Sequence, residues 1–145
     1  MPDEVPLAGV SARHRLIDLL DIGDERGWLL VAEEQAQVPF DIHRLFVLHS
    51  LPEGASRGHH AHREQHQFLI LLSGGCQVIV DDGAARHSVA LETCSKALYA
   101  PPMLWLELRD FQPGSICAVL VSGRYDETDY IRDRTEFLKL AGTPR

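Results

Sequence analysis

Short apolar runs, separated by turn residues, recur through the middle of the chain. The runs are rich in Val, Ile, Leu and Phe, and Gly, Pro or Asp residues stand between them. Regular spacing of this kind predicts antiparallel strands in a sandwich or barrel. The expected strands are Trp28–Val31, Arg44–His49, Gln67–Ser73, Cys76–Asp81, His87–Leu91, Lys96–Ala100, Trp105–Leu108 and Ile116–Ser122.

The connections support an all-β fold with one helix at its end. Ser73-Gly74-Gly75 and Asp81-Asp82-Gly83 are typical hairpin turns, because Gly and Asp tolerate a positive φ. The segment 127–139 predicts a short helix whose Tyr130, Phe137 and Leu138 face the body of the protein. There is no internal repeat or linker, so we expect residues 1–145 to form a single domain.

Composition narrows the class of protein. The 145 residues are 45% hydrophobic and 24% charged, which is typical of a soluble globular protein. A formal net charge of -7 without a basic stripe argues against a nucleic-acid partner. No apolar run approaches the about 20 residues needed to span a membrane, and no secretory signal is evident. The three widely spaced cysteines are typical of reduced, packed thiols, so we expect a cytoplasmic protein.

Four of the eight histidines fall within eight positions, in the segment 57–67. If this segment is extended, alternation of side chains places His60, His62 and His66 on one side and His59 on the other. Histidines on one face can bind a metal, move protons or hold an anionic ligand.

The residues around these histidines favour proton transfer over a metal. His60-Ala61-His62 followed by Gln67 resembles the first motif of the cupin barrels, but Gln67 stands where a glutamate ligand is expected. The second-motif segment 99–106 has no histidine, so two of the usual four ligands are missing. A pair of imidazoles with pKa values near ~6.5 is suited to acid–base chemistry at neutral pH. A metal-dependent cupin that uses His60, His62 and His66 remains an alternative.

An ordered series of motifs along nearly the whole chain resembles one cupin family. The series comprises Asp24-Glu25-Arg26-Gly27, Val38 to Arg44, Arg57 to His62, Gln67, Asp81-Asp82-Gly83, Leu98-Tyr99, Trp105 to Leu108, Val121-Ser122 and Tyr125 to Arg132. It is similar to the WxcM-like sugar-nucleotide 3,4-ketoisomerases, which act on dTDP-4-keto-6-deoxyglucose in deoxyamino-sugar synthesis. The resemblance implies an RmlC-like cupin jelly-roll barrel with a short C-terminal helix, an isomerase activity without metal or other cofactor, and a homodimer.

The same resemblance implies roles for individual residues. His62 would remove the proton at C3 of the sugar, and His60 would assist proton transfer or orient the intermediate. The remaining candidates would bind the dTDP-sugar; they are Arg44, Arg57, Gln67, His66, Tyr99 and Trp105. For each of these, core packing or a surface ion pair is the competing interpretation.

Three departures from the family pattern bear on the reaction. Phe46 stands where the family has an active-site tyrosine, and a phenyl ring cannot transfer a proton. His66 replaces a glutamate, and Leu106 replaces a histidine. Three interpretations follow: His66 takes over the tyrosine's role, the substrate differs, or the protein is a non-catalytic module that binds a nucleotide sugar. The choice between dTDP and UDP and the configuration of the product at C4 stay open.

Overall fold

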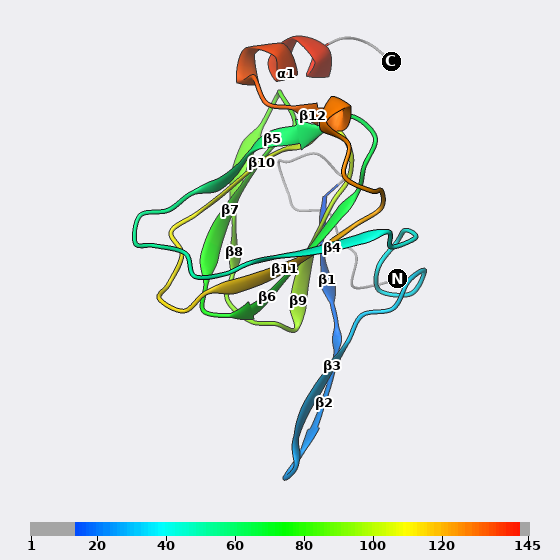
Figure 1. Ribbon diagram of the computed structural model, residues 1–145, viewed down its shortest axis with the longest axis vertical. Coiled ribbons are helices and arrows are strands. Elements are labelled where there is room, and N and C mark those ends of the chain that lie inside the picture. Colours follow the sequence, from blue (N-terminus) through cyan, green and yellow to red (C-terminus); the bar gives the residue numbers. More distant parts are fainter. Residues whose placement is uncertain (1–13, 143–145) are drawn as a thin grey trace.

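Two five-stranded antiparallel sheets face each other in the computed structural model, which describes residues 14–142 (Figure 1). The first sheet has the order β1 (Arg15–Asp18), β9 (Lys96–Ala100), β6 (Gln67–Ser73), β11 (Ile116–Val121) and β4 (Arg44–Leu48). The second has the order β12 (Tyr130–Ile131), β5 (Arg57–His62), β10 (Trp105–Arg109), β7 (Cys76–Asp81) and β8 (Arg86–Leu91). The all-β prediction is confirmed, and each of the eight expected strands forms within two residues of its expected ends.

The main core lies between the two sheets. Alternate residues of facing strands point inward, for example Leu69 and Leu71 of β6 and Val78 and Val80 of β7, and all four are buried. Burial of this face against the opposite sheet removes a large apolar area from water, which is the principal stabilising term of a sandwich.

A second core covers the outer face of the first sheet. Phe68, Ile70 and Tyr99 point outward from β6 and β9 and pack against Val38 and Phe40, which lie in the connection between β3 and β4. Residues with odd and even numbers in β6 therefore serve two different cores. The inward set is the one that reaches the space between the sheets.

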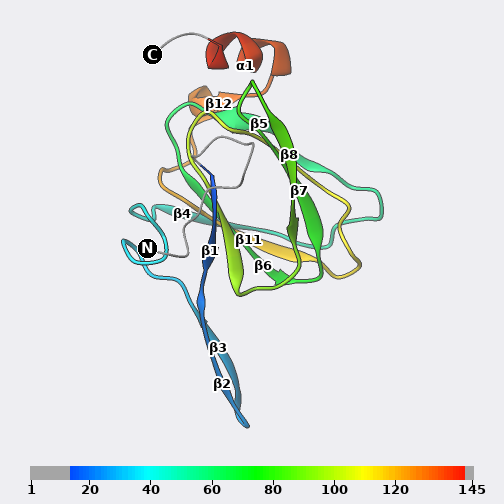
Figure 2. The ribbon, with the colours of Figure 1, turned by 180° about the vertical axis from the view of Figure 1, so that it is seen from behind.

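A hairpin of β2 (Leu20–Asp24) and β3 (Gly27–Val31) forms its own two-stranded sheet. It extends from the barrel on the side opposite the C-terminal helix in both views (Figures 1 and 2). Gly23 is directly opposite Trp28, and a Cβ at Gly23 would lie 2.1 Å from the indole ring. The indole can lie across the ribbon here because residue 23 has no side chain.

The C-terminal segment corrects the expected helix over 127–139. The chain first forms a 3₁₀ turn (Glu127–Asp129) and β12, and α1 (Arg134–Ala141) begins only after Asp133. Asp133 accepts a hydrogen bond from the backbone N–H of Thr135, which is the usual N-cap interaction. Phe137 is buried as expected, whereas Leu138 is 41% exposed, contrary to expectation.

None of the described helices is long and apolar enough to cross a membrane.

Candidate active site

A cavity of about 440 Å³ opens between the two sheets. Aliphatic side chains line part of it: Leu48, Leu69, Leu106, Leu108 and Val119. Polar and aromatic side chains from β4, β5, β6 and the segment 125–132 line the rest. A volume of this size, with apolar walls and a few convergent polar groups, is typical of a small-molecule site.

A β-bulge in β5 positions the histidines. The pairing with β10 shifts between His60 opposite Leu106 and Gly58 opposite Glu107, so His59 is the additional residue. Gly58 has φ +86°, and a Cβ there would lie 2.8 Å from the carbonyl oxygen of Leu106. Glycine is therefore required at residue 58. His60 and His62, which follow the bulge, lie on one side with ring centroids 5.1 Å apart.

His62 forms a buried pair with Asp129. Its Nδ1 donates to Asp129 Oδ2 over 2.9 Å, and both residues are less than 10% exposed. The carboxylate also accepts hydrogen bonds from the backbone N–H groups of Glu64 and Gln65, at 2.7 and 3.3 Å. This hydrogen bond assigns the proton of the neutral ring to Nδ1 and leaves a lone pair on Nε2.

That Nε2 atom is buried, and it has no hydrogen-bond partner within residues 14–142. Burial lowers the pKa of His62, although the hydrogen bond that His62 donates to Asp129 acts in the opposite direction. His62 is therefore an uncharged base whose accepting nitrogen is unoccupied.

His60 is also uncharged at neutral pH. Burial and, to a lesser extent, repulsion by His62 lower its pKa from 6.5 to about 4. Its Nδ1 donates to the carbonyl of Gly58 over 3.0 Å, and its ring lines the cavity. The site thus contains two neutral imidazoles, of which His60 is directly exposed to the cavity.

Tyr130 completes an aromatic cluster with these rings. It pairs with His62 across β12 and β5, and its ring centroid lies 4.4 Å from that of His62 and 4.9 Å from that of His60. Tyr130 and His60 both line the cavity, whereas His62 does not. His62 is therefore in contact with two cavity-lining rings.

Three arginines, Arg44, Arg57 and Arg132, also line the cavity. Arg132 is paired with Glu127, with N···O distances of 2.7 and 2.9 Å. Arg44 donates to Gln65 and, over 3.5 Å, to the hydroxyl of Tyr130, and no carboxylate of the described residues forms an ion pair with Arg44 or Arg57. Two uncompensated guanidinium groups beside a cavity favour an anionic ligand.

Four of the candidate site residues named from the sequence line the cavity in the structure: Arg44, Arg57, His60 and Gln67. Gln67 points inward at the start of β6 and is 5% exposed. Phe46 lines the same cavity from β4, and the guanidinium of Arg44 lies 5.7 Å from the centre of its ring.

His66 and Tyr99 lie elsewhere, which corrects the expectation that His66 shares a side with His60 and His62. The chain leaves β5 after His62 and enters the other sheet at Gln67, so His66 points to the outer face of that sheet. There its Nδ1 is 2.7 Å from the hydroxyl of Tyr99, and its ring contacts Phe40. Within residues 14–142, no three His, Cys, Asp or Glu side chains are grouped as a metal site would require.

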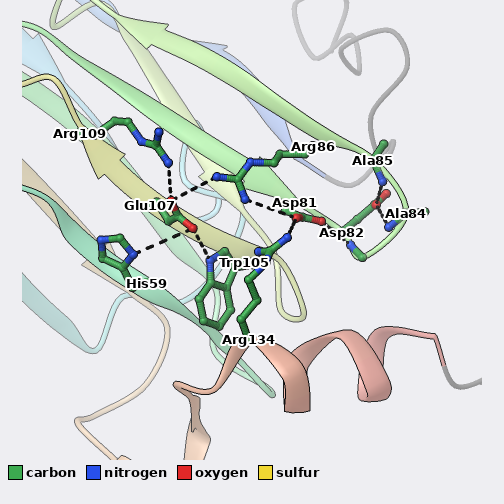
Figure 3. Close-up of polar contacts among 11 residues, drawn as sticks. His59, Asp81, Asp82, Ala84, Ala85, Arg86, Trp105, Glu107, Arg109 and Arg134 are labelled. Carbon is green, nitrogen blue, oxygen red and sulfur yellow. Dashed lines mark hydrogen bonds and ion pairs between the residues drawn. The ribbon is translucent and has the colours of Figure 1, made fainter.

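Trp105 lies on the outer face of the second sheet, and it does not line the cavity. Its ring packs against Phe137 of α1, and its Nε1 donates to Glu107 over 2.9 Å. Figure 3 shows Glu107 surrounded by Trp105, His59, Arg86 and Arg109, while Arg134 of α1 is paired with Asp81. This ionic cluster attaches the C-terminal helix to the sheet.

Sequence reasoning missed the residues contributed by the segment 125–132. Asp129, Tyr130 and Arg132 were expected in a helix, Tyr130 with its side chain toward the body of the protein, and none of the three was expected in the site. The available signal was the motif Tyr125 to Arg132, which belongs to the family resemblance and carries charged and aromatic residues without helical periodicity.

Comparison with known proteins relates the chain to one family of sugar-modifying enzymes. Residues 12–142 match the model of the family described as FdtA, WxcM-like, C-terminal. The TDP-4-oxo-6-deoxy-alpha-D-glucose-3,4-oxoisomerase of Aneurinibacillus thermoaerophilus is 38% identical over 126 residues, which cover 87% of this chain and 91% of that protein.

Solved structures share the fold. QdtA, a sugar 3,4-ketoisomerase from Thermoanaerobacterium thermosaccharolyticum solved in complex with TDP, superposes with a TM-score of 0.86 at 35% identity, over 89% of this chain and 94% of that one. The rmlC epimerase of Mycobacterium tuberculosis gives a TM-score of 0.74 at 18% identity, over 88% and 70%, which is a likeness of fold alone. The expected RmlC-like cupin barrel is confirmed, and the chain belongs to the FdtA (WxcM-like, C-terminal) family.

Proposed function

We propose that this protein is a sugar-nucleotide 3,4-ketoisomerase, which moves the keto group of dTDP-4-keto-6-deoxyglucose from C4 to C3. The main observation is the pair of neutral imidazoles, His60 and His62, beside a cavity with two arginines that form no ion pair with a carboxylate of residues 14–142. The 3,4-oxoisomerase from Aneurinibacillus and the TDP complex of QdtA support the substrate class.

The reaction requires proton transfer and no change in overall oxidation state. The C4 ketone acidifies the proton at C3, and removal of that proton gives an enediol. Protonation at C4, with loss of the proton from the C3 hydroxyl, then gives the 3-keto sugar. An uncharged imidazole is the kind of base that this sequence needs at neutral pH.

We assign removal of the C3 proton to His62 and assistance in this transfer to His60. His62 Nε2 is buried beside the cavity-lining rings of His60 and Tyr130, so this assignment requires these rings to shift when the sugar binds. When His62 Nε2 takes up a proton, the ring becomes positively charged, and the carboxylate of Asp129, 2.9 Å from Nδ1, stabilises that charge. His60 lines the cavity next to His62 and can orient the intermediate.

Arg44 and Arg57 are proposed to bind the anionic part of the substrate. A guanidinium group donates two parallel hydrogen bonds to a diphosphate or to an enediolate, and it stays charged at any working pH. Gln67 is proposed as a further polar contact to the sugar because its buried side chain lines the cavity. The outward positions of His66, Tyr99 and Trp105 give no support to a substrate contact by these residues.

A direct assay tests this function. The purified protein is incubated with dTDP-4-keto-6-deoxyglucose, and the sugar carbons are followed by NMR; we expect the carbonyl carbon signal to move from C4 to C3. Tight binding of the substrate, measured by calorimetry, without any such conversion would instead support a non-catalytic nucleotide-sugar-binding module. Competition by dTDP and UDP in the same calorimeter identifies the preferred nucleotide.

We also propose a homodimer in which the β2–β3 hairpin contacts a second copy of the chain. Leu20, Ile22 and Leu29 lie on one face of the hairpin and are at least half exposed. On β4, an edge strand of the barrel, Leu45 and Val47 are also exposed and form an apolar surface on the same molecule. A pair of copies related by a two-fold axis can cover both surfaces at once.

A cytoplasmic location and a single-domain organisation are proposed as well. Cys76, Cys94 and Cys117 are all free, and burial raises the pKa of Cys76 to about 11, as is usual for packed thiols in a reducing compartment. A nucleotide-sugar substrate is consistent with this location.

A further inference from the structure

The proposed isomerisation moves two protons, one between carbons and one between oxygens. While the C3 proton is transferred to C4, the oxygen at C4 must gain a proton and the oxygen at C3 must lose one. The imidazole pair accounts for the carbon-bound proton. The oxygen-bound proton requires another group with an exchangeable hydrogen in the cavity.

Among the described residues that line the cavity, Ser56, Tyr125 and Tyr130 carry a hydroxyl. The aliphatic hydroxyl of Ser56, which lies 2.9 Å from His59 Nε2, is far less acidic than a phenol, so the two tyrosines are the suitable proton donors. Guanidinium groups are excluded because arginine does not release a proton at physiological pH. The hydroxyl of Tyr125 donates to Glu127 over 2.5 Å, and the residue is 60% exposed. Tyr130 is less exposed and contacts both His60 and His62, so it lies where the reaction is proposed to occur.

The hydrogen bonds of Tyr130 leave its own proton available. Its oxygen accepts from Arg44 over 3.5 Å, and within residues 14–142 no acceptor is present for the hydroxyl hydrogen. The guanidinium of Arg132 lies 4.3 Å from the centre of the ring. The charge of Arg132 is shared with Glu127, so Arg44, which contacts the oxygen, is the group that stabilises the negative charge developing there when the proton leaves.

We propose that Tyr130 is a catalytic residue that carries the proton between the C4 and C3 oxygens of the sugar. This inference rests on the proposed ketoisomerase function. It places the carbon-bound proton on the imidazole pair and the oxygen-bound proton on the phenol. It also explains how the cavity can operate with Phe46, which has no hydroxyl, on the neighbouring wall.

The step balances without any further reactant. The C3–H bond breaks as the imidazole takes the proton, the C3–C4 double bond forms, and the C4 oxygen takes the proton of Tyr130. In the second half, the phenolate removes the proton from the C3 hydroxyl, the C3 carbonyl forms, and the imidazolium returns its proton to C4. Both residues end in their starting states.

The test compares Tyr130→Phe with the wild-type protein. We expect kcat for 3-keto product to fall by about 10²-fold or more, which is within the usual range for loss of an acid–base group. The Kd for dTDP should stay within about threefold of the wild-type value. Tyr99→Phe is the matched control, because it removes a phenol hydroxyl from the opposite face of the first sheet and should keep kcat within about threefold.

A rescue experiment makes the test specific for a missing hydroxyl. The double variant Phe46→Tyr/Tyr130→Phe places a phenol on the adjacent wall of the cavity. We expect its kcat to be at least about tenfold higher than that of Tyr130→Phe alone. If the wild-type protein converts the substrate and Tyr130→Phe does so within about threefold of the same rate, the role of Tyr130 is refuted while the proposed function stands. If the wild-type protein itself gives no conversion, the proposed function fails.

A second measurement applies if Tyr130→Phe does not fold. Site-specific replacement of Tyr130 by a fluorinated tyrosine retains the ring and makes the phenol more acidic. The alkaline limb of the kcat profile should then move to lower pH. An unchanged profile would overturn the proposal.

Discussion

Asp129 determines both the orientation and the protonation of His62. Three hydrogen bonds hold its carboxylate, one from the imidazole and two from backbone N–H groups of Glu64 and Gln65. Because the carboxylate fixes the proton on Nδ1, the opposite nitrogen is the one that can act as a base. A buried residue on a 3₁₀ turn thus controls the chemistry of a residue on a strand 67 positions earlier in the sequence.

This arrangement predicts the effect of Asp129→Asn. The amide has nearly the same shape but no charge, so it can no longer stabilise an imidazolium, and it can hold the ring in the wrong tautomer. We expect kcat to fall by about 10²- to 10³-fold, with a KM close to that of the wild type. Steady-state kinetics measure both; a change mainly in KM would mean that Asp129 serves substrate binding instead.

The lowered pKa of His60 predicts how the stability of the protein depends on pH. The folded protein keeps His60 uncharged down to about pH 4, whereas the unfolded chain takes up this proton near 6.5. The stability contributed by this group is therefore complete above pH 6.5 and decreases as the pH falls toward 4. NMR titration of the His60 ring should show a midpoint near pH 4, and a midpoint near 6.5 would show that burial does not control this group.

Individual site residues could be predicted from the sequence where strand alternation holds. Arg44, His60 and Gln67 line the cavity because each lies on the inward side of a strand, and alternation is a local property. His66 was misplaced because alternation does not continue through the turn between β5 and β6, where the chain changes sheets. Asp129 and Tyr130 reach the site through the pairing of β12 with β5. The motif Tyr125 to Arg132 marks these residues, but strand alternation does not show which distant strand they meet.

At the scale of elements, the β2–β3 hairpin is the least expected feature. Trp28–Val31 was predicted as a strand, but its partner β2 and the separation of the pair from both sheets were not. Its face of Leu20, Ile22 and Leu29 resembles a core surface, and residues 14–142 leave these three side chains at least half exposed. This pattern is typical of an element that is covered only in an assembly.

The hairpin prediction is tested with Ile22→Asp/Leu29→Asp. Two carboxylates opposite each other on the apolar face should prevent its burial, so the variant should behave as a 16.2 kDa monomer and the wild type as a dimer. Light scattering coupled to gel filtration measures both masses. Glu25→Ala, at the tip of the hairpin, should leave the dimer intact, and a wild type that is monomeric at all concentrations would refute the proposed dimer.

The C-terminal helix was predicted from the sequence, but the residue at which it begins was not. The segment 127–139 contains good helix formers, but Tyr130 and Ile131 gain more from pairing with β5 than from helix formation. The helix consequently begins at the next N-cap, Asp133. Tertiary pairing of this kind routinely overrides local helix propensity.

At the scale of the whole molecule, charge is distributed unevenly. The chain carries a formal net charge of -7, yet three arginines line the cavity between its sheets. One of them, Arg132, is paired with the carboxylate of Glu127. An acidic surface with a basic cavity favours a small anionic ligand over a polyanion such as nucleic acid. The fold itself was predictable from the strand pattern, whereas the cavity depends on how the two sheets are spaced and could be seen only in three dimensions.

His62 is proposed to remove the C3 proton of a 4-keto sugar nucleotide. The most direct measurement is the disappearance of the C3 proton signal of dTDP-4-keto-6-deoxyglucose in deuterated water, followed by NMR with wild-type protein and with His62→Asn at equal concentration. We predict that the wild type removes the signal within minutes and that His62→Asn is slower by at least about 10³-fold, a loss that an acid–base residue can account for. Equal rates for the two proteins would contradict the assignment of His62 as the base.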